Sequence, residues 1–453
     1  MKTNKFLLSF LFAYLAVLII AYILLPVSDS EFIFEGLFLI SITLSVIITY
    51  ISNKGASLVV LFLLFVLFFN GTRPIVDFIG LNDINTLDFF YEGHISAKDN
   101  CRALLNLSIA TVSIVIGHLL FICKYTKSTN KSSSNIIIPS FILYLLFIIG
   151  FAAKIYESYK SFSFLSAFSY HEMFISGESI PIYVRVLELL PLFVCLYKLS
   201  LGHKIWMIWF FIYIVLGVAT GQRGPAMMSL VIMIYFLAKK NVIKLNLKRA
   251  TFFVVTIFVF STAVSNLRNN KDFFTEDDTF TTFLWDQGVT YSQLQIVIKE
   301  RDKLKYSLAD MFGNVYSTFK LNIRPNIYCP DDHLSTTAKK YRMWSKYISY
   351  ETNPKLYYLG MGLGGNYIAQ VFCVGGEMAV FIFSMLVGFF LNFIDKRLIY
   401  GNILLTFICF NLLISVLYIP RDNYFQFLTA MIEPLLASFL LYFIYIGVKL
   451  LKS

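Results

Sequence analysis

The stretch Thr220-Gly221-Gln222-Arg223-Gly224-Pro225 interrupts a long apolar part of the sequence. Apolar segments flank it on both sides, and the only charge between them is the arginine. A glycine can adopt backbone angles that other residues avoid, and a proline suits the first turn of a helix. The stretch therefore predicts a tight hairpin between two membrane helices, with the arginine at its tip.

The tip of this hairpin also suits an anion. A helix that begins at Pro225 presents free backbone N–H groups toward the tip. Arg223 adds a guanidinium group, which can bind phosphate oxygens through two parallel hydrogen bonds. The simpler alternative is that Arg223 only flanks a membrane span, as lysines and arginines often do. The positions of the other arginines favour the anion site.

The composition is typical of a polytopic α-helical membrane protein. Hydrophobic residues make up 58% of the 453 residues and charged residues only 14%, against roughly a quarter charged in soluble proteins. Apolar runs of about twenty residues recur along the chain. The run from Phe6 to Leu25 is too long for a signal-peptide core, so we expect a span. The net charge of +11 reflects loop lysines and arginines and does not indicate nucleic-acid binding.

The sequence predicts an all-α fold with about twelve transmembrane helices and one large periplasmic loop. The expected spans are 6–26, 32–51, 56–70, 103–123, 136–154, 181–200, 205–220, 225–239, 250–267, 366–394, 400–418 and 424–447. They divide the chain into N-terminal membrane helices (1–267), the loop (268–365) and C-terminal membrane helices (366–453).

Lysines and arginines predict the orientation of these spans. With the N-terminus inside, the cytoplasmic segments carry 17 of them, whereas the short outer loops carry 7, among them Arg73, Arg102 and Lys154. Cytoplasmic loops are enriched in these residues. We therefore expect both termini in the cytoplasm, and the Arg223 hairpin and the 268–365 loop on the outer side.

The 268–365 loop is too long to lack secondary structure. A helix-capping pattern at 275–278 precedes helical spacing that continues to Ile298, and a second helix is expected at about 308–319. The loop is rich in aromatic residues, including Trp285 and Trp344. Such residues either anchor a protein at the membrane interface or stack on sugar rings, and both interpretations stay open.

Four arginines are expected on the outer side. Arg223 lies in its hairpin, Arg268 begins the long loop, Arg421 ends a span beside Asp422, and Arg185 lies inside the sixth span. A charge inside a span is usually functional or paired, and Glu188 could pair with Arg185. If the four converge, they form an electropositive site at the outer membrane boundary, where a lipid diphosphate headgroup is the natural ligand.

The glycine-rich stretch Gly360-Met361-Gly362-Leu363-Gly364-Gly365-Asn366 precedes the tenth span. Glycines let the backbone approach a ligand or a helix closely. As a phosphate loop the pattern is incomplete, because no Lys-Ser/Thr follows it. The last three residues of the stretch are therefore candidates for binding substrate.

Carboxylates and glycines inside spans are further candidates. Glu377 and Glu433 each lie within a span, so each could be a catalytic base or a buried hydrogen-bonding group. Gly375 and Gly376 are interpreted as allowing tight helix packing. The histidines and cysteines lack metal-ligand spacing, so we expect neither a metal nor another cofactor.

Together these residues resemble the Wzy-type O-antigen and capsule polymerases, also called oligosaccharide repeat unit polymerases. The resemblance rests on 221–224 between two spans, the long loop after Arg268, the stretch 360–370 and Arg421. It covers roughly 205–435 and the overall topology. One departure is Gln370, which stands where an acidic residue is expected.

The resemblance implies a GT-C-like fold and a function in the bacterial inner membrane. Such polymerases act at the periplasmic face on undecaprenyl-diphosphate-linked repeat units, and transfer the growing glycan to an incoming unit without a nucleotide sugar. Membrane lipids, a chain-length regulator and a flippase are the partners it implies. It also implies that outer arginines hold the diphosphate.

That function assigns roles to particular residues. The diphosphate-binding role falls on Arg223, Arg268 and Arg421, and Arg185, Gly221, Gln222 and Gly224 are candidate substrate contacts. A diphosphate leaving group needs charge stabilisation, which arginines supply without a metal. An acceptor hydroxyl that attacks from the opposite face inverts the anomeric carbon, and a carboxylate such as Glu377 could take its proton.

Other functions fit part of the pattern. An O-antigen ligase has a similar topology, and His333 in the long loop would suit it. A lipid-linked oligosaccharide flippase or other transporter usually has two pseudo-symmetric halves, whereas here one loop of nearly a hundred residues makes the chain asymmetric. A structural partner in glycan assembly is the third alternative.

Overall fold

The structure is a computed structural model of the whole chain. It describes residues 2–24, 30–53, 55, 57–80, 91, 93–125, 138–167, 180–218, 223–240, 242–243, 280–323, 335–400 and 402–450. Within these ranges every regular element is a helix, which confirms the all-α prediction. Gly221, Gln222, Arg268 and the expected span 250–267 lie outside the described residues.

Eight helical segments among the described residues are long and apolar enough to cross a membrane. They are α1 (Lys2–Leu24), α2 (Glu31–Asn53), the joined helices α3 (Leu58–Val66), η2 (Leu67–Gly71) and α4 (Thr72–Phe78), α5 (Ala97–Tyr125), α6 (Ser140–Ala167), α20 (Tyr367–Tyr400), α21 (Ile403–Tyr418) with η5 (Ile419–Arg421), and α22 (Gln426–Ala430) with α23 (Ile432–Leu450). The shorter helices α8 (Ile182–Leu187), α9 (Leu190–Ser200), α10 (Trp206–Val218) and α11 (Arg223–Lys239) complete the bundle. The protein is therefore a polytopic membrane protein.

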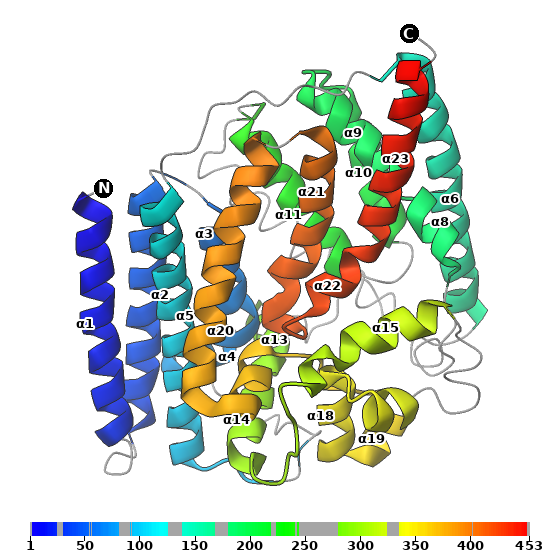
Figure 1. Cartoon of the computed structure of the whole chain (residues 1–453). Helices are drawn as coiled ribbons and strands as arrows, with labels where there is room; N and C mark the ends of the chain where they lie inside the picture. The colour runs from blue at the N-terminus through cyan, green and yellow to red at the C-terminus, as the bar shows by residue number, and fades with distance from the viewer. Residues whose placement is uncertain are drawn as a thin grey trace.

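The remaining helices belong to the long loop. They are α13 (Phe280–Gln287), α14 (Val289–Glu300), η3 (Asp310–Phe312), α15 (Gly313–Ile323), η4 (Thr336–Lys340), α18 (Trp344–Thr352) and α19 (Pro354–Tyr358). Figure 1 shows them gathered at one end of the bundle, which we call the loop end, while both termini lie toward the other end. The two helical regions expected in this loop are therefore present.

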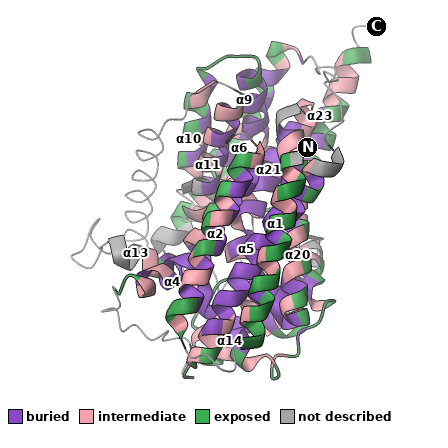
Figure 2. Ribbon diagram, turned by 90° about the vertical axis from the view of Figure 1, so that its left-hand side faces the viewer, coloured by how far each residue is buried: buried purple, intermediate pink, exposed green. Residues whose placement is uncertain are grey.

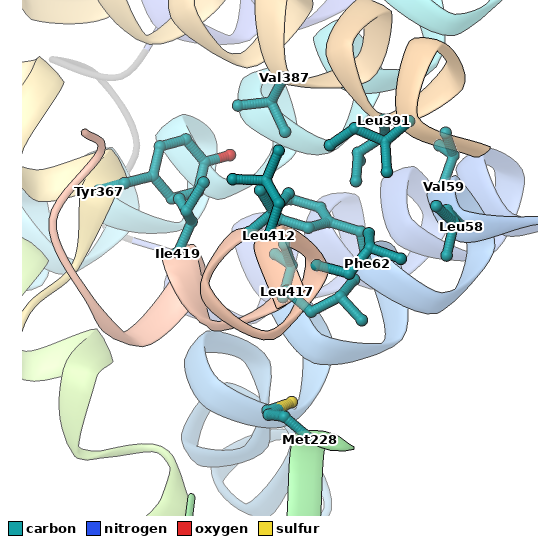
Figure 3. Packing of buried hydrophobic residues seen from close by; sticks show 14 of the residues in the cluster. Leu58, Val59, Phe62, Met228, Tyr367, Val387, Leu391, Leu412, Leu417 and Ile419 are labelled. Atoms are coloured by element: carbon teal, nitrogen blue, oxygen red, sulfur yellow. The ribbon is translucent and has the colours of Figure 1, made fainter. Parts of the chain in front are cut away.

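The core of the bundle is built around α5. Figure 2 shows mostly buried residues along α5, between the exposed residues of α1 and α2. On its other side α5 touches α20 so closely that a Cβ on Gly117 would lie 1.9 Å from the carbonyl oxygen of Met385. Small residues let membrane helices approach in this way. Deeper in the bundle, Phe62 of α3, Leu391 of α20 and Leu412 of α21 pack together (Figure 3).

The helix α20 reverses direction instead of crossing as one span. Gly375 and Gly376 have non-helical angles, and Gly376 has φ +64° and ψ −152°. The hydroxyls of Tyr367 and Ser384 are 3.2 Å apart, although a straight helix would separate them by about 25 Å. Residues 367–374, which we call the fold-back segment, therefore pack against residues 377–400. The expectation that the two glycines only allow tight packing within one span is wrong.

Three basic residues expected in outer loops lie on helices. Arg73 is on α4 because the third span continues to Phe78, Arg102 is near the start of α5, and Lys154 is on α6, which continues to Ala167. Arg73 and Lys154 are only 8% and 7% exposed. A buried cation must be paired, and Lys154 donates to Glu157 and, at 3.4 Å, to Glu188.

Candidate functional site

Asn366 ties the long loop to the bundle. Its Nδ2 donates to Oδ1 of Asn70 at 2.6 Å and to the carbonyl of Thr290 at 2.8 Å. Its Oδ1 accepts from the N–H of Ile368 at 2.9 Å and so caps the fold-back segment. The side chain is fully buried. The polar groups of Asn366 are thus occupied by the protein itself.

Arg421 lies next to this network, because Nδ2 of Asn70 also donates to the carbonyl of Pro420 at 3.0 Å. Its Nη1 donates to Oε1 of Gln287 at 2.8 Å, and its guanidinium carbon lies 5.4 Å from the centroid of the Phe69 ring. No carboxylate in the described part of the chain forms an ion pair with it. The charge of this partly exposed guanidinium is therefore available to an anion.

The start of α11 reaches the same place. A Cβ on Gly224 would lie 3.2 Å from the hydroxyl oxygen of Tyr418, which is one turn before Arg421. Arg223 is the first residue of α11. The structure thus places the first turn of α11 against the side chain of Tyr418, which belongs to residues 418–424, here called the Arg421 segment.

A cavity of about 380 Å³ lies next to this contact, between α6, α8 to α11 and α21 to α23. Ser229 of α11 and Ser415 of α21 line it; Ser229 lies about one turn after Gly224, and Ser415 about one turn before Tyr418. The charged side chains of its lining are Lys154, Glu157, Arg185, Glu188 and Glu433. Such a concentration of charge between apolar helices usually has a function.

Two ion pairs in this cavity join residues that are distant in sequence. Nη1 of Arg185 lies 2.8 Å from Oε1 of Glu433, whereas Glu188 contacts Lys154. The structure thus pairs Arg185 with a carboxylate that is distant in sequence, and the expected pair of Arg185 with Glu188 stays a prediction. Within the described ranges, no group of His, Cys, Asp and Glu side chains could hold a metal ion.

Glu377 lies away from this cavity. It follows the reversal of α20, and its Oε1 accepts from Nε and Nη2 of Arg102 at 2.8 Å and 2.7 Å. Figure 1 shows α5 and α20 on one side of the bundle and α6 and α8 on the other. The structure therefore does not bring Glu377 together with Arg185.

The two candidate tryptophans have different surroundings. The guanidinium carbon of Arg73 lies 4.9 Å from the centroid of the Trp285 ring, and its Nε donates to the Trp285 carbonyl at 3.1 Å. Trp285 is still partly exposed. Trp344 is fully buried, and its Nε1 donates to Oε1 of Gln293 at 3.2 Å. Of these two tryptophans, Trp285 is therefore the one that a sugar could still reach.

The glycine-rich stretch holds the fold-back segment in place. Gly364 has φ +76°, and its carbonyl accepts from Nε2 of Gln293 at 2.9 Å. A Cβ on Gly365 would lie 2.8 Å from the backbone of Asp422. Gln370, one turn further, accepts from the N–H of Tyr424 at 2.7 Å. The segment is thereby packed against the residues that follow Arg421.

Asp422 is a candidate that the sequence analysis treated only as a neighbour of Arg421. Its Oδ1 accepts from the N–H of Asn423 at 2.7 Å. Burial raises the pKa of Asp422 to about 7. A general base works best with a pKa near the ambient pH. The available signal in the sequence was a carboxylate directly after an arginine at the end of a span.

Comparison with known proteins identifies the family. Residues 6–453 match the family model described as O-antigen polysaccharide polymerase Wzy. No curated protein and no solved structure matches the chain. The family match extends the resemblance from 205–435 to nearly the whole sequence, and it favours a polymerase over a ligase or a flippase. The chain therefore belongs to the O-antigen polysaccharide polymerase Wzy family.

Proposed function

We propose that this protein transfers a growing O-antigen glycan from its undecaprenyl diphosphate carrier to an incoming lipid-linked repeat unit, at the periplasmic face of the inner membrane. Membership of the Wzy family already makes it a multi-pass membrane protein that polymerises lipid-linked O-antigen repeat units. One observation supports the location of the reaction. The first turn of α11, which begins with Arg223, meets the Arg421 segment beside a charged cavity.

The diphosphate is held by Arg223, Arg268 and Arg421 in this proposal. Arg421 is suited to it because Gln287 orients its guanidinium, and no carboxylate among the described residues forms an ion pair with it. The N–H groups at the start of α11 add partial positive charge at the same place. Arg185 contributes less, because Glu433 already neutralises it.

The reaction is an inverting glycosyl transfer. A hydroxyl oxygen of the incoming unit attacks the anomeric carbon of the growing glycan and forms the new glycosidic bond. The bond from that carbon to the diphosphate breaks, and undecaprenyl diphosphate leaves with the electron pair. Arginines stabilise the charge that develops on its oxygens, so the proposed reaction needs no metal ion.

The proton of the attacking hydroxyl needs an acceptor. Asp422 is the better placed carboxylate, because it follows Arg421 directly and its pKa of about 7 leaves it ready to take a proton at neutral pH. Glu377, the candidate from the sequence, remains a second one, although its carboxylate is already paired with Arg102 at 2.7 Å.

The test compares two substitutions at Arg223 in a strain that lacks the chromosomal gene. Loss of a charge-assisted contact costs about 1.5–3 kcal/mol, so Arg223→Ala should reduce polymerisation about tenfold to a hundredfold or more. Arg223→Lys keeps the positive charge but lacks the planar guanidinium, so it should recover part of the polymerisation activity. Glycan ladders on gels measure the product, and immunoblots of membranes measure the protein.

Arg397→Ala is the matched control. Arg397 lies near the end of α20, away from the loop end, and its guanidinium contacts Phe393. This variant should keep a normal ladder. Full activity of both Arg223 variants at normal protein levels would contradict the proposal and leave Arg223 as a residue that only flanks a span.

A further inference from the structure

A second pair of arginines lies at the far end of the fold-back segment. The guanidinium carbons of Arg102 and Arg301 lie 5.1 Å and 5.2 Å from the centroid of the Phe372 ring. Arg102 comes from α5, and Arg301 follows α14 of the long loop. One aromatic ring thus brings together two cations that are distant in sequence, through cation–π contacts.

The pair carries an excess of positive charge. Glu377 pairs with Arg102 at 2.7 Å. Arg301 has no carboxylate partner among the residues with described positions, and its Nη1 would lie 3.2 Å from a Cβ on Gly376. Only glycine readily adopts the backbone angles of Gly376, so the reversal of α20 also makes the space for Arg301. Two cations and one carboxylate leave one positive charge for a ligand.

The depth of this pair suits the headgroup of a lipid. Arg102 lies in the second turn of a membrane helix at the loop end. Tyr22, in the last turn of α1, lies 5.9 Å from its guanidinium carbon. Tyrosines of this kind mark the boundary between membrane and water. The side chains of Arg102 and Glu377 are 28% and 24% exposed, so a ligand can reach them.

A pocket adjoins the arginines on the side of the long loop. It has a volume of about 290 Å³, and Tyr91, Glu300, Lys303 and Glu351 are among its lining residues. Glu300 and Lys303 belong to the same turn as Arg301. The hydroxyl of Tyr91 donates to Oε1 of Glu300 at 2.7 Å. Convergent polar groups around an aromatic ring are suited to binding the hydroxyl groups of a sugar.

We propose that Arg102 and Arg301 bind the phosphate of a second lipid-linked saccharide, and that the first sugars of this saccharide enter the adjoining pocket. The inference rests on the proposed function, because joining two lipid-linked saccharides requires one chain to hold two lipid phosphates at once. The Arg421 segment holds one of them and the Arg102–Arg301 pair the other. The fold-back segment contacts both sites and so sets the spacing between the two substrates.

The test measures how many molecules of radiolabelled undecaprenyl diphosphate the purified full-length protein binds. The wild type should bind two equivalents. Arg301→Gln should keep one and bind the second at least about tenfold more weakly, because a charge-assisted contact is lost. Arg301→Lys should recover part of this binding. Lys305→Gln, which removes an exposed charge four residues away, should keep both equivalents. Thermal unfolding near that of the wild type shows that each variant is folded.

Three outcomes separate this inference from the proposed function. If Arg301→Gln binds as the wild type and Arg421→Gln loses an equivalent, the second site is overturned and the first stands. If only Arg301→Gln loses an equivalent, the second site is supported and the role of Arg421 is overturned. If phosphatidylglycerol displaces the probe from the Arg301 site as well as unlabelled undecaprenyl diphosphate does, the site binds ordinary phospholipid, and the proposal of a substrate site is overturned.

The pocket has its own test with the lipid-linked repeat unit isolated from a host that lacks the gene. Tyr91→Ala should weaken binding of this saccharide at the Arg301 site several-fold, because its hydroxyl and ring face the pocket. The same change should leave the binding of sugar-free undecaprenyl diphosphate unchanged. An equal loss for both probes would contradict a sugar-binding role for the pocket.

Discussion

At the scale of single residues, the two tryptophans of the long loop show that surroundings decide what a residue does. Trp344 is enclosed by the protein, with the ring of Tyr306 at 4.8 Å and its N–H bonded to Gln293. Trp285 stacks against Arg73 and keeps part of its surface exposed. Their similar positions in an aromatic-rich loop gave no reason to separate them.

We expect these two residues to respond differently to substitution. Trp344→Ala should destabilise the protein by roughly 3–5 kcal/mol, as large cavities in a core do, and should lower its amount in the membrane. Trp285→Ala should leave the amount of protein nearly unchanged. If the ring stacks on a sugar, this change should weaken the binding of the glycan by about 1 kcal/mol. Immunoblots and glycan ladders measured side by side distinguish the two effects. A normal ladder for Trp285→Ala would indicate an interfacial role.

Asp422 gives a prediction about pH. Its carboxyl group can accept a proton only when ionised, and its pKa is raised to about 7 by burial. Polymerisation in vitro should therefore rise between about pH 6 and 8, with a midpoint close to 7. Asp422→Asn should abolish it. A pH profile without a rise in this range would remove Asp422 from the reaction.

The same pKa makes a prediction about stability. The folded state binds the proton of Asp422 more tightly than the unfolded state does, because the ordinary pKa is 3.8. The favourable contribution to folding is therefore complete below about pH 4 and is lost as the pH rises through about 7. Asp422→Asn cannot ionise, so its unfolding temperature should fall less than that of the wild type between pH 5 and 8. Equal changes in the unfolding temperatures of the two proteins over this pH range would contradict the raised pKa of Asp422.

At the scale of elements, the contact of α5 with α20 depends on glycines. A Cβ on Gly388 would lie 1.8 Å from the carbonyl oxygen of Ile114, so Gly388→Ala must push the helices apart. We expect a clear fall in the unfolding temperature of the purified protein. Gly447→Ala in α23 is the matched control, because nothing lies within 4 Å of its Cβ. That variant should be neutral or slightly stabilised, since alanine favours a helix.

The reversal of α20 is the element that connects both proposed sites. Gly365, before the fold-back segment, touches the backbone of Asp422, and Phe372 within it contacts Arg102 and Arg301. Gln370 between them is bonded to Tyr306 of the long loop at 3.0 Å. A short helix that is held at its start and at two residues within it can keep two ligands at a constant distance.

At the scale of the whole molecule, the orientation in the membrane can be measured directly. Lys98 and Thr336 lie at the loop end, whereas Ser128 and Asn246 fall in segments expected to be cytoplasmic and outside the described residues. Single cysteines at Lys98 and Thr336 should react with impermeant thiol reagents in spheroplasts, and those at Ser128 and Asn246 should not. Four of the six native cysteines are described, free and buried, and Cys123 and Cys329 are replaced by serine in the parent protein for this labelling. Labelling at Asn246 from outside would invert the topology and place Arg223 in the cytoplasm.

The class of the protein follows from the amino-acid sequence alone. The length of an apolar run is a local property, and a run of about twenty residues can only cross a membrane as a helix unless it is buried in protein. Most helices therefore begin and end near the expected residues, and the long loop and its two helical regions were also predictable. The resemblance to polymerases came from residues around Arg223 and Arg421, and the family match confirms it.

Which of these residues meet could be seen only in the folded protein. Arg185 pairs with the distant Glu433, Trp344 is buried whereas Trp285 is partly exposed, and Arg102 and Arg301 share one ring. The reversal at Gly375 and Gly376 could not be deduced, because the apolar pattern on both sides continues as in a single span. Ion pairs, burial and reversals of this kind depend on which helices become neighbours. That choice is made by close packing between parts of the chain that are far apart in sequence.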